Sequence, residues 1–449
     1  MAVLTTGGAG SPALLPLVDH HCHAWAEADL DPAGLASSLT EAAEGPWGWD
    51  TLLGVSLRRW CAPVLDLPAG CRPADYAARR AELGGAEVAR RFLGAAALDA
   101  VLVDTGLAAP GQLAPDLAAM SRVAGAPAHE VLRLEAVAEE LVSGSASGPR
   151  PPSAARPADP SAARFADRFA ARPADPSAAR PADPSAARPA DHSDARPASA
   201  ARFADRFAAL LAARLAAEPA PVACKSIIAY RHGLDFDPAR PGPAEVAEAA
   251  AEWLGHVPPA GAGGGGEPGW SSGPAPRLVH PVLLRHLLWA GIDTGLPLQI
   301  HTGIGDADEV LHQADPSLLT PFLRATAGSG SAVMLLHTYP YHRQAAYLAG
   351  VFPHVHVDVG LATTLTGHRL GAVLAETLEL APFTKLLYSS DAYGLAELHY
   401  LGAHRFRTAL VAALEPLSAV EGLDAGEVLA IARLIGAGNA RRAYRLAGP

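Results

Sequence analysis

Short apolar runs alternate along the chain with Ala- and Leu-rich segments of helical periodicity. This alternation is typical of βα units around a parallel sheet. The apolar runs predict eight strands, at 17–23, 98–104, 131–135, 222–230, 297–301, 332–337, 355–359 and 385–391. Helices are predicted between the later strands, at 203–217, 244–254, 282–290, 341–349 and 370–380. The third strand has an alternative, because 128–142 is also compatible with one helix.

Eight strands with intervening helices predict an α/β fold, a (β/α)8 TIM-type barrel whose chemistry lies at the C-terminal strand ends. The 449 residues are interpreted as one domain, 1–449. The span 24–97 is longer than a βα loop needs, which predicts an inserted helical segment, either a cap over the site or simple aromatic packing. The segment 425–446 predicts C-terminal helices on the barrel base.

Two segments have compositions that cannot build a core. Residues 150–198 repeat a unit of eight residues, RPADPSAA, with almost no large apolar side chain, which predicts a low-complexity, disordered insertion. Residues 258–276 are rich in Gly and Pro, but no Lys-Ser/Thr follows the glycines as in a phosphate-binding loop. They predict a flexible loop.

Composition and charge narrow the function classes. A formal net charge of −11 argues against nucleic-acid binding, which needs a concentrated basic surface, and favours a small-molecule substrate. The chain shows neither a basic leader nor a run of about 18 apolar residues, so we expect a cytoplasmic protein without a membrane span. Four cysteines without a CxxC pair indicate reduced thiols rather than disulfides.

The richest polar motif is DHHCH, residues 19–23, directly after an apolar run. On a regular strand Asp19, His21 and His23 would project to one side, and His20 and Cys22 to the other. Two imidazoles one strand step apart suit a divalent cation, with a carboxylate to orient them. The motif therefore indicates a metal site at the end of the first strand.

Further polar residues fall at the ends of other predicted strands: Lys225 in the fourth, His301 in the fifth, His337 in the sixth and Asp391 in the eighth. Each has an ordinary alternative, as a hydrogen-bonded core histidine, a helix cap or an ion-pair partner. Those alternatives do not account for their joint occurrence at strand ends, which favours one metal centre.

Several cations are candidates for binding a substrate carboxylate through a bidentate fork. Arg231 and His232 follow the fourth strand, and we expect them to bind substrate, although a surface position is an equal alternative. Arg133 and Glu135 are weaker candidates for the site in general, because they depend on the uncertain third strand.

The chain resembles the amidohydrolase superfamily, and its amidohydrolase-related branch in particular. The resemblance is carried by VDHHCH (18–23), CKSIIAYR (224–231), QIHTG (299–303), LLH (335–337) and YSSD (388–391). The run 225–234, with 389–392, is similar to amidohydrolase domains fused to, or beside, glutamine-synthetase-like proteins.

The resemblance implies a ligand set. His21, His23 and Asp391 would bind a catalytic metal, with His301 as a further ligand and His337 as a second-metal ligand or a residue orienting substrate or water. Lys225 matches a lysine that some members carboxylate to bridge two metals, so one or two ions are expected. Zinc is the first expectation, with Mn, Fe or Ni as alternatives.

The expected reaction is metal-dependent hydrolysis of a C–N bond, amide or γ-glutamyl-type, in a small molecule. Asp391 would take the water proton and pass it to the leaving amine, with His337 and Lys225 as further catalytic residues. The alternatives are a metal-dependent decarboxylase of the same superfamily and a binding or regulatory partner of a glutamine-synthetase-like enzyme. A homodimer is expected on superfamily grounds.

Overall fold

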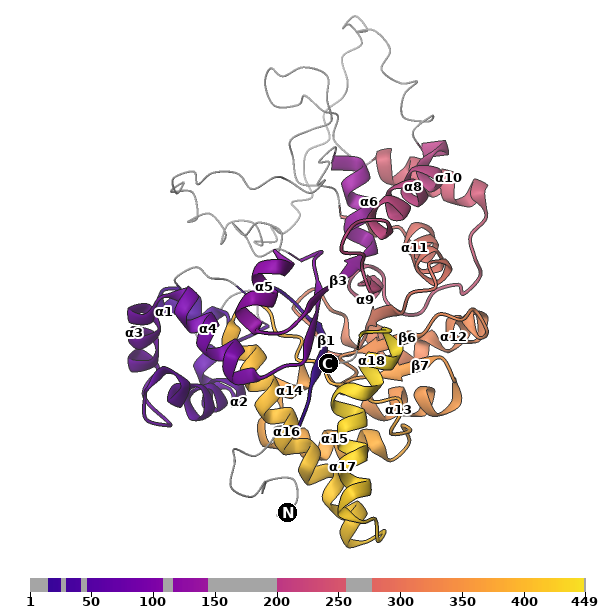
Figure 1. Cartoon of the computed structure of the whole chain (residues 1–449). Coiled ribbons are helices and arrows are strands. Elements are labelled where there is room, and N and C mark those ends of the chain that lie inside the picture. The colour runs from indigo at the N-terminus through magenta and orange to yellow at the C-terminus, as the bar shows by residue number, and fades with distance from the viewer. Residues whose placement is uncertain are drawn as a thin grey trace, which may run out of the picture.

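A computed structural model describes residues 15–25, 30–41, 47–107, 116–143, 200–255 and 277–447 (Figure 1). The predicted insertion at 150–198 and the Gly/Pro-rich loop at 258–276 lie outside these residues, so the predictions about them stay untested.

Seven parallel strands form one sheet in which each strand pairs with the next along the chain. They are β1 (Val18–Cys22), β2 (Ala100–Asp104), β3 (Ala128–Arg133), β4 (Ala223–Ser226), β5 (Leu298–His301), β6 (Val333–Leu336) and β7 (Val355–Val357). Helices connect successive strands, as parallel pairing requires. The predicted α/β class is confirmed, and the seven-stranded curled parallel sheet is consistent with the predicted TIM-type barrel.

The helices surround this sheet (Figure 1). They are α1 (Pro32–Ser37), α2 (Leu52–Ser56), α3 (Pro73–Leu83), α4 (Gly85–Ala96), α5 (Leu117–Ala124), α6 (Leu134–Ser143), α8 (Phe203–Leu215), α9 (Ile228–Arg231), α10 (Pro243–Gly255), α11 (Pro281–Asp293), α12 (Thr320–Thr326), α13 (His342–Val351), α14 (Ala362–Leu365), α15 (Leu370–Leu378), α16 (Ala396–Ala419), α17 (Ala425–Arg433) and α18 (Asn439–Ala443). None in the described part of the chain has the length and apolar character needed to cross a bilayer.

The predicted eighth strand, 385–391, does not form a regular strand, but its backbone bonds to both edges of the sheet. On one side Leu387 N–H donates to the Val357 carbonyl of β7 (3.0 Å). On the other, His20 N–H of β1 donates to the Tyr388 carbonyl (3.1 Å), and Asp391 N–H donates to the His21 carbonyl (3.1 Å). The segment therefore links β7 back to β1 and brings Asp391 beside the DHHCH motif.

Both interpretations of the region around the third strand are partly right. The chain is extended as β3 up to Arg133 and becomes helical at Leu134, where α6 begins. The predicted strand 131–135 therefore ends two residues early, and Glu135 lies in the first turn of α6. Its carboxylate accepts hydrogen bonds from Ser226 Oγ (2.6 Å) and Ile227 N–H (3.0 Å).

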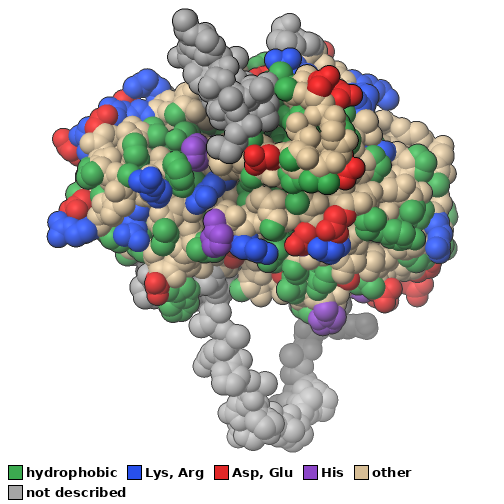
Figure 2. Space-filling model, turned by 90° about the horizontal axis from the view of Figure 1, so that it is seen from below, with side chains coloured by type: hydrophobic (Ala, Val, Ile, Leu, Met, Phe, Trp, Pro, Cys, Tyr) green, Lys and Arg blue, Asp and Glu red, His purple; other side chains and the backbone are tan. Residues whose placement is uncertain are grey.

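Buried apolar side chains fill both sides of the sheet. Inward-facing residues such as Val18, Leu102 and Met334 form a small cluster that includes Tyr444, just beyond α18. The larger cluster lies between strands and helices and includes Cys22 and Cys224. On the surface shown in Figure 2, acidic and basic side chains are interspersed rather than gathered into a continuous basic area.

Candidate metal centre

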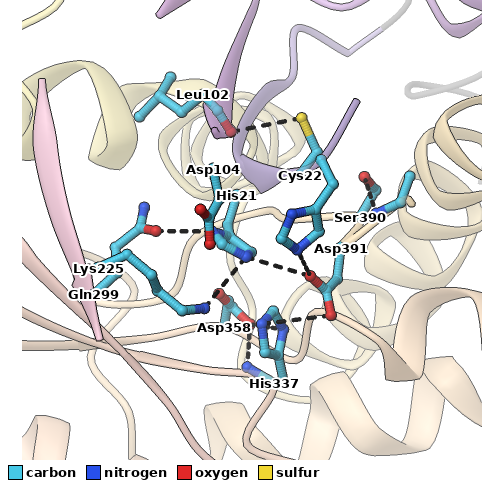
Figure 3. A network of polar contacts seen from close by, with 12 residues as sticks. His21, Cys22, Leu102, Asp104, Lys225, Gln299, His337, Asp358, Ser390 and Asp391 are labelled. Carbon is cyan, nitrogen blue, oxygen red and sulfur yellow. Dashed lines mark hydrogen bonds and ion pairs between the residues drawn. The ribbon is translucent and has the colours of Figure 1, made fainter. Parts of the chain in front are cut away.

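Three histidines surround one carboxylate at the C-terminal ends of the strands (Figure 3). Oδ1 of Asp391 lies 3.3 Å from His21 Nε2 and 3.4 Å from His23 Nε2. Oδ2 of the same carboxylate lies 3.4 Å from His337 Nε2. Side chains far apart in the sequence thus meet at one point, as the strand-end argument predicts.

The first strand does not alternate regularly. The pairing register of β1 with β2 shifts between Asp19 and Cys22, as in a β-bulge. Asp19 accepts hydrogen bonds from Ser390 N–H (2.9 Å) and Ser390 Oγ (2.5 Å), and it lies beside Cys22 and His399. The prediction that Asp19 projects with the two ligand-type histidines is therefore wrong.

His20 was expected to share the face of Cys22, and this is also wrong, because the same bulge turns it inward. Its Nδ1 lies 2.9 Å from Tyr444 Oη, in the cluster inside the sheet, and its Nε2 lies 2.8 Å from Asp358 Oδ2. Asp358 Oδ1 in turn accepts a hydrogen bond from the backbone N–H of His337 (2.8 Å). His20 therefore connects the interior of the sheet to the strand end that carries His337.

Gln299 fixes the orientation of His21. Its Nε2 donates to the carbonyl oxygen of His20 (2.8 Å), which can only accept, so its Oε1 faces His21 Nδ1 at 2.8 Å. His21 Nδ1 must therefore carry the proton, and the lone pair of Nε2 points towards Asp391. Burial lowers the pKa of His21 to about 4, so the ring is neutral, the form that binds a metal.

Asp391 and His337 both have backbone angles in the left-handed region, with φ of 50° and 59°. Such strain in non-glycine residues concentrates at functional sites. Burial would raise the pKa of Asp391, but the neighbouring imidazoles of His337, His21 and His23 hold it well below its ordinary value. The cluster is therefore built around an ionised carboxylate.

Lys225, on β4, lies inside the same cluster. Its Nζ is 3.3 Å from His21 Nε2, and the residue is 1% exposed. Burial lowers its pKa to about 8. A lowered pKa raises the share of neutral amine, the form in which a lysine would be carboxylated.

His301, at the end of β5, lies beside His337, with ring centroids 4.9 Å apart. Its Nε2 is 3.5 Å from Oε2 of Glu309, whose side chain is 3% exposed. His301 Nε2 and both carboxylate oxygens of Glu309 are buried without a hydrogen-bond partner among the described residues. Buried polar atoms of this kind need a further partner.

These donors fit a divalent metal ion. His21, His337 and Asp391 place one ligand atom each within 4.8 Å of one another, as do His21, His23 and Asp104. Asp391 Oδ1 is also buried without a hydrogen-bond partner. Neutral imidazoles around an ionised carboxylate are the donor set of Zn and related metals.

The two residues predicted to bind substrate are not brought into this cluster. Arg231 lies in α9, with its Nη2 3.2 Å from Glu139 Oε1, and His232 is exposed. Among the described residues, no hydrogen bond or ion pair joins either of them to the histidines.

Other residues at the site were missed or underrated. Asp104 and Asp358 were not singled out, although each falls in a predicted strand near its C-terminal end, the signal that located His301. Arg133, a weaker candidate, forms a buried ion pair with Asp104 at 2.6 Å. Glu309 lies in the loop after β5 and carries no sequence signal of its own.

The parallel sheet and the His/Asp cluster define an α/β protein with a metal-type centre at the C-terminal strand ends. Comparisons with known proteins agree. A solved structure from Lactobacillus casei ATCC 334, assigned as a metal-dependent hydrolase, is 25% identical, with a TM-score of 0.69 over 96% of this chain and 95% of that chain. A glucuronate isomerase from Caulobacter crescentus is 14% identical, with a TM-score of 0.59 over 97% and 92%, and shows the shared fold.

Among curated proteins, Protein fluG of Emericella nidulans is 38% identical over 115 residues. The match covers 25% of this chain and 13% of that protein, so it spans a small part of its relative. No family model matches the chain. Taken together, the comparisons confirm that the chain resembles the amidohydrolase superfamily and its amidohydrolase-related branch.

Proposed function

We propose that this chain is a metal-dependent hydrolase that cleaves a C–N bond of a small molecule. The observation that carries the proposal is the convergence of His21, His23 and His337 on the Asp391 carboxylate at 3.3–3.4 Å. The similarity to the Lactobacillus casei protein assigned as a metal-dependent hydrolase supports it.

His21, His23 and Asp391 would hold a divalent ion, with zinc expected first. His301, His337 and Lys225 would complete the site, for one ion or for two. A bound ion would supply Lewis acidity towards a carbonyl oxygen and towards water.

The residues of the chain would then divide the remaining work. The free Oδ of Asp391 would accept a proton from water and return it to the leaving amine, because an ionised carboxylate next to the reacting atoms serves as base and then as acid. His337, anchored by its backbone N–H to Asp358, would orient the substrate carbonyl. Residues 24–97 would cover the site and exclude bulk water.

The substrate bond follows from the motif resemblance to amidohydrolase domains associated with glutamine-synthetase-like proteins. We infer an amide or γ-glutamyl-type bond, and a glutamine-synthetase-like protein as a candidate partner. Decarboxylation by the same centre and a purely regulatory role are the alternatives that the assay must separate.

The first experiment measures metal per chain by plasma mass spectrometry after purification without chelators. The variant is His21→Ala/His23→Ala, and the matched control is His312→Ala, an exposed histidine in the loop after β5. We expect one or two equivalents in the parent and the control, and loss in the double variant. A parent that carries no metal and takes up no Zn, Mn, Fe or Ni would overturn the proposal.

The second experiment incubates the loaded protein with γ-glutamyl amides, N-acyl amino acids and a uronate. Release of amine or ammonia supports hydrolysis. Release of carbon dioxide without an amine indicates the decarboxylase, and conversion of the uronate indicates isomerisation. A metal-loaded protein that turns over none of them but binds a glutamine-synthetase-like protein indicates the regulatory role.

A further inference from the structure

Arg133 is a buried cation at the mouth of the sheet. It is the last residue of β3 and the register partner of Lys225 on β4, so both side chains start from the same level of the sheet. Arg133 is 8% exposed. A buried arginine is costly unless it is paired or reserved for a charged ligand.

Asp104 occupies one edge of the guanidinium group. Arg133 Nε lies 3.1 and 3.2 Å from the two carboxylate oxygens, and Nη2 donates to Oδ2 at 2.6 Å. An arginine has five N–H donors, and this arrangement uses the side edge formed by Nε and Nη2. The end edge, formed by Nη1 and the second N–H of Nη2, makes no hydrogen bond with the described residues.

That end edge is accessible. Nη1 of Arg133 forms no hydrogen bond with any described residue. It is not fully buried either, so a ligand can reach it. Arg231 differs in this respect, because its Nε and Nη1 are both buried without partners while Nη2 faces Glu139.

The aliphatic part of the Arg133 side chain passes directly against Gly106. A Cβ at residue 106 would lie 2.3 Å from Arg133 Cβ and 2.7 Å from its Cδ, so only glycine lets the stem pass. Together with the two-point pairing to Asp104, this fixes the guanidinium before any ligand arrives. A pre-organised fork loses little entropy when it binds a carboxylate.

The end edge belongs to the same site as the histidines. Asp104, which holds the arginine, lies within 4.8 Å of the ligand atoms of His21 and His23. Lys225, the register partner of Arg133 on β4, has its Nζ 3.3 Å from His21 Nε2. Arg133 therefore faces the space next to the metal-type cluster.

We propose that the end edge of Arg133 binds a carboxylate of the substrate, so that the substrate is an amide bearing a free carboxylate close to the C–N bond. An N-acyl amino acid and a γ-glutamyl amide both have this chemistry. The inference rests on the proposed function for the bond cleaved, but carboxylate binding is measured without turnover. It assigns to Arg133 the role that the sequence suggested for Arg231.

The experiment measures binding of glutarate to the metal-loaded full-length protein by isothermal titration calorimetry, with uncharged glutaramide as the reference ligand. The variants are Arg133→Lys, which keeps the charge but loses the fork, Arg231→Lys, and Arg240→Lys as an exposed control. We expect Arg133→Lys to weaken glutarate binding by about tenfold or more, with unchanged metal content and unchanged glutaramide binding. Millimolar guanidinium should restore part of the glutarate binding to Arg133→Ala.

Equal glutarate affinity in the parent and in a metal-replete Arg133→Lys would overturn the inference. So would glutarate binding to the parent that is no tighter than glutaramide binding, or a loss confined to Arg231→Lys. If Arg133→Lys loses glutarate while no amide is hydrolysed by the parent, the carboxylate site stands and the proposed hydrolysis fails.

Discussion

Replacing Gln299 by leucine tests whether the orientation of His21 depends on this one amide. Gln299 is fully buried and makes three hydrogen bonds, to His21 Nδ1 (2.8 Å), the His20 carbonyl (2.8 Å) and Tyr444 Oη (2.9 Å). Leucine has a similar volume and no polar atoms. The change therefore removes the hydrogen bonds without opening a large cavity.

The magnitude follows from the groups left behind. His21 Nδ1 and the His20 carbonyl would each be buried without this partner, while Tyr444 keeps its contact with His20. At about 1–3 kcal/mol for each unsatisfied group, the free energy of unfolding should fall by roughly 2–6 kcal/mol. Removing the group that orients a ligand histidine also lowers metal affinity by about 10–100-fold.

The assays are urea unfolding for stability and competition with a chelator for zinc affinity. Tyr444→Phe is the matched control, because it removes a hydroxyl that contacts Gln299 but leaves the Gln299–His21 hydrogen bond intact. The control should lose stability and keep its zinc affinity. If Gln299→Leu is destabilised yet binds zinc as tightly as the parent, the tautomer of His21 does not depend on Gln299 and the reasoning is refuted.

Three further changes test other parts of the structure. Gly360→Ala places a Cβ 2.0 Å from His337 Nδ1, at a residue with a φ of +24°. The displaced His337 should lower the metal content measured by plasma mass spectrometry, and an unchanged metal content would count against His337 as a metal ligand. Arg80→Met removes the ion-pair partner, at 2.8 Å, of the fully buried Glu397. The free energy of unfolding in urea should fall by about 3–5 kcal/mol, and adding Glu397→Gln should recover most of it. Burial lowers the pKa of His356 to about 3, so below about pH 6.5 the unfolded chain binds a proton at this residue and the folded chain does not, and the free energy of unfolding falls on acidification. His356→Phe should remove about 2 kcal/mol of the stability that is lost between pH 7.5 and pH 5. An unchanged pH profile of stability would contradict this.

The strands and the polar residues at their ends could be predicted from the sequence, because one physical rule applies to every strand of a parallel sheet. Buried parallel strands are short apolar runs, and their C-terminal ends meet at one edge, so a polar residue at a run's end predicts its neighbours in space. His301 ends β5, and His337 directly follows β6. The strand bounds were wrong by up to four residues, most of all for the predicted strand 222–230, which ends at Ser226 and gives way to α9, but these errors did not alter the convergence.

The rule fails where the backbone departs from regular geometry. A period of two placed Asp19 with His21, but a register shift in β1 turns Asp19 towards Ser390 instead. Nothing in DHHCH marks the bulge, because it arises from pairing with a neighbouring strand. The link from His21 through Gln299 to Tyr444 was equally out of reach, since Tyr444 lies 145 residues from Gln299 in sequence.

The choice between Arg231 and Arg133 shows why register matters more than residue type. Arg231 follows β4 in sequence, but the chain turns into α9 immediately after the strand, at the point where Glu135 accepts a hydrogen bond from Ile227 N–H (3.0 Å). That turn directs Arg231 to Glu139. Arg133 reaches the site because its strand pairs with β4 at Lys225, a register set by hydrogen bonds between distant segments. An arginine near a strand end is thus only a candidate, and the pairing of the strands decides which one faces the His/Asp cluster.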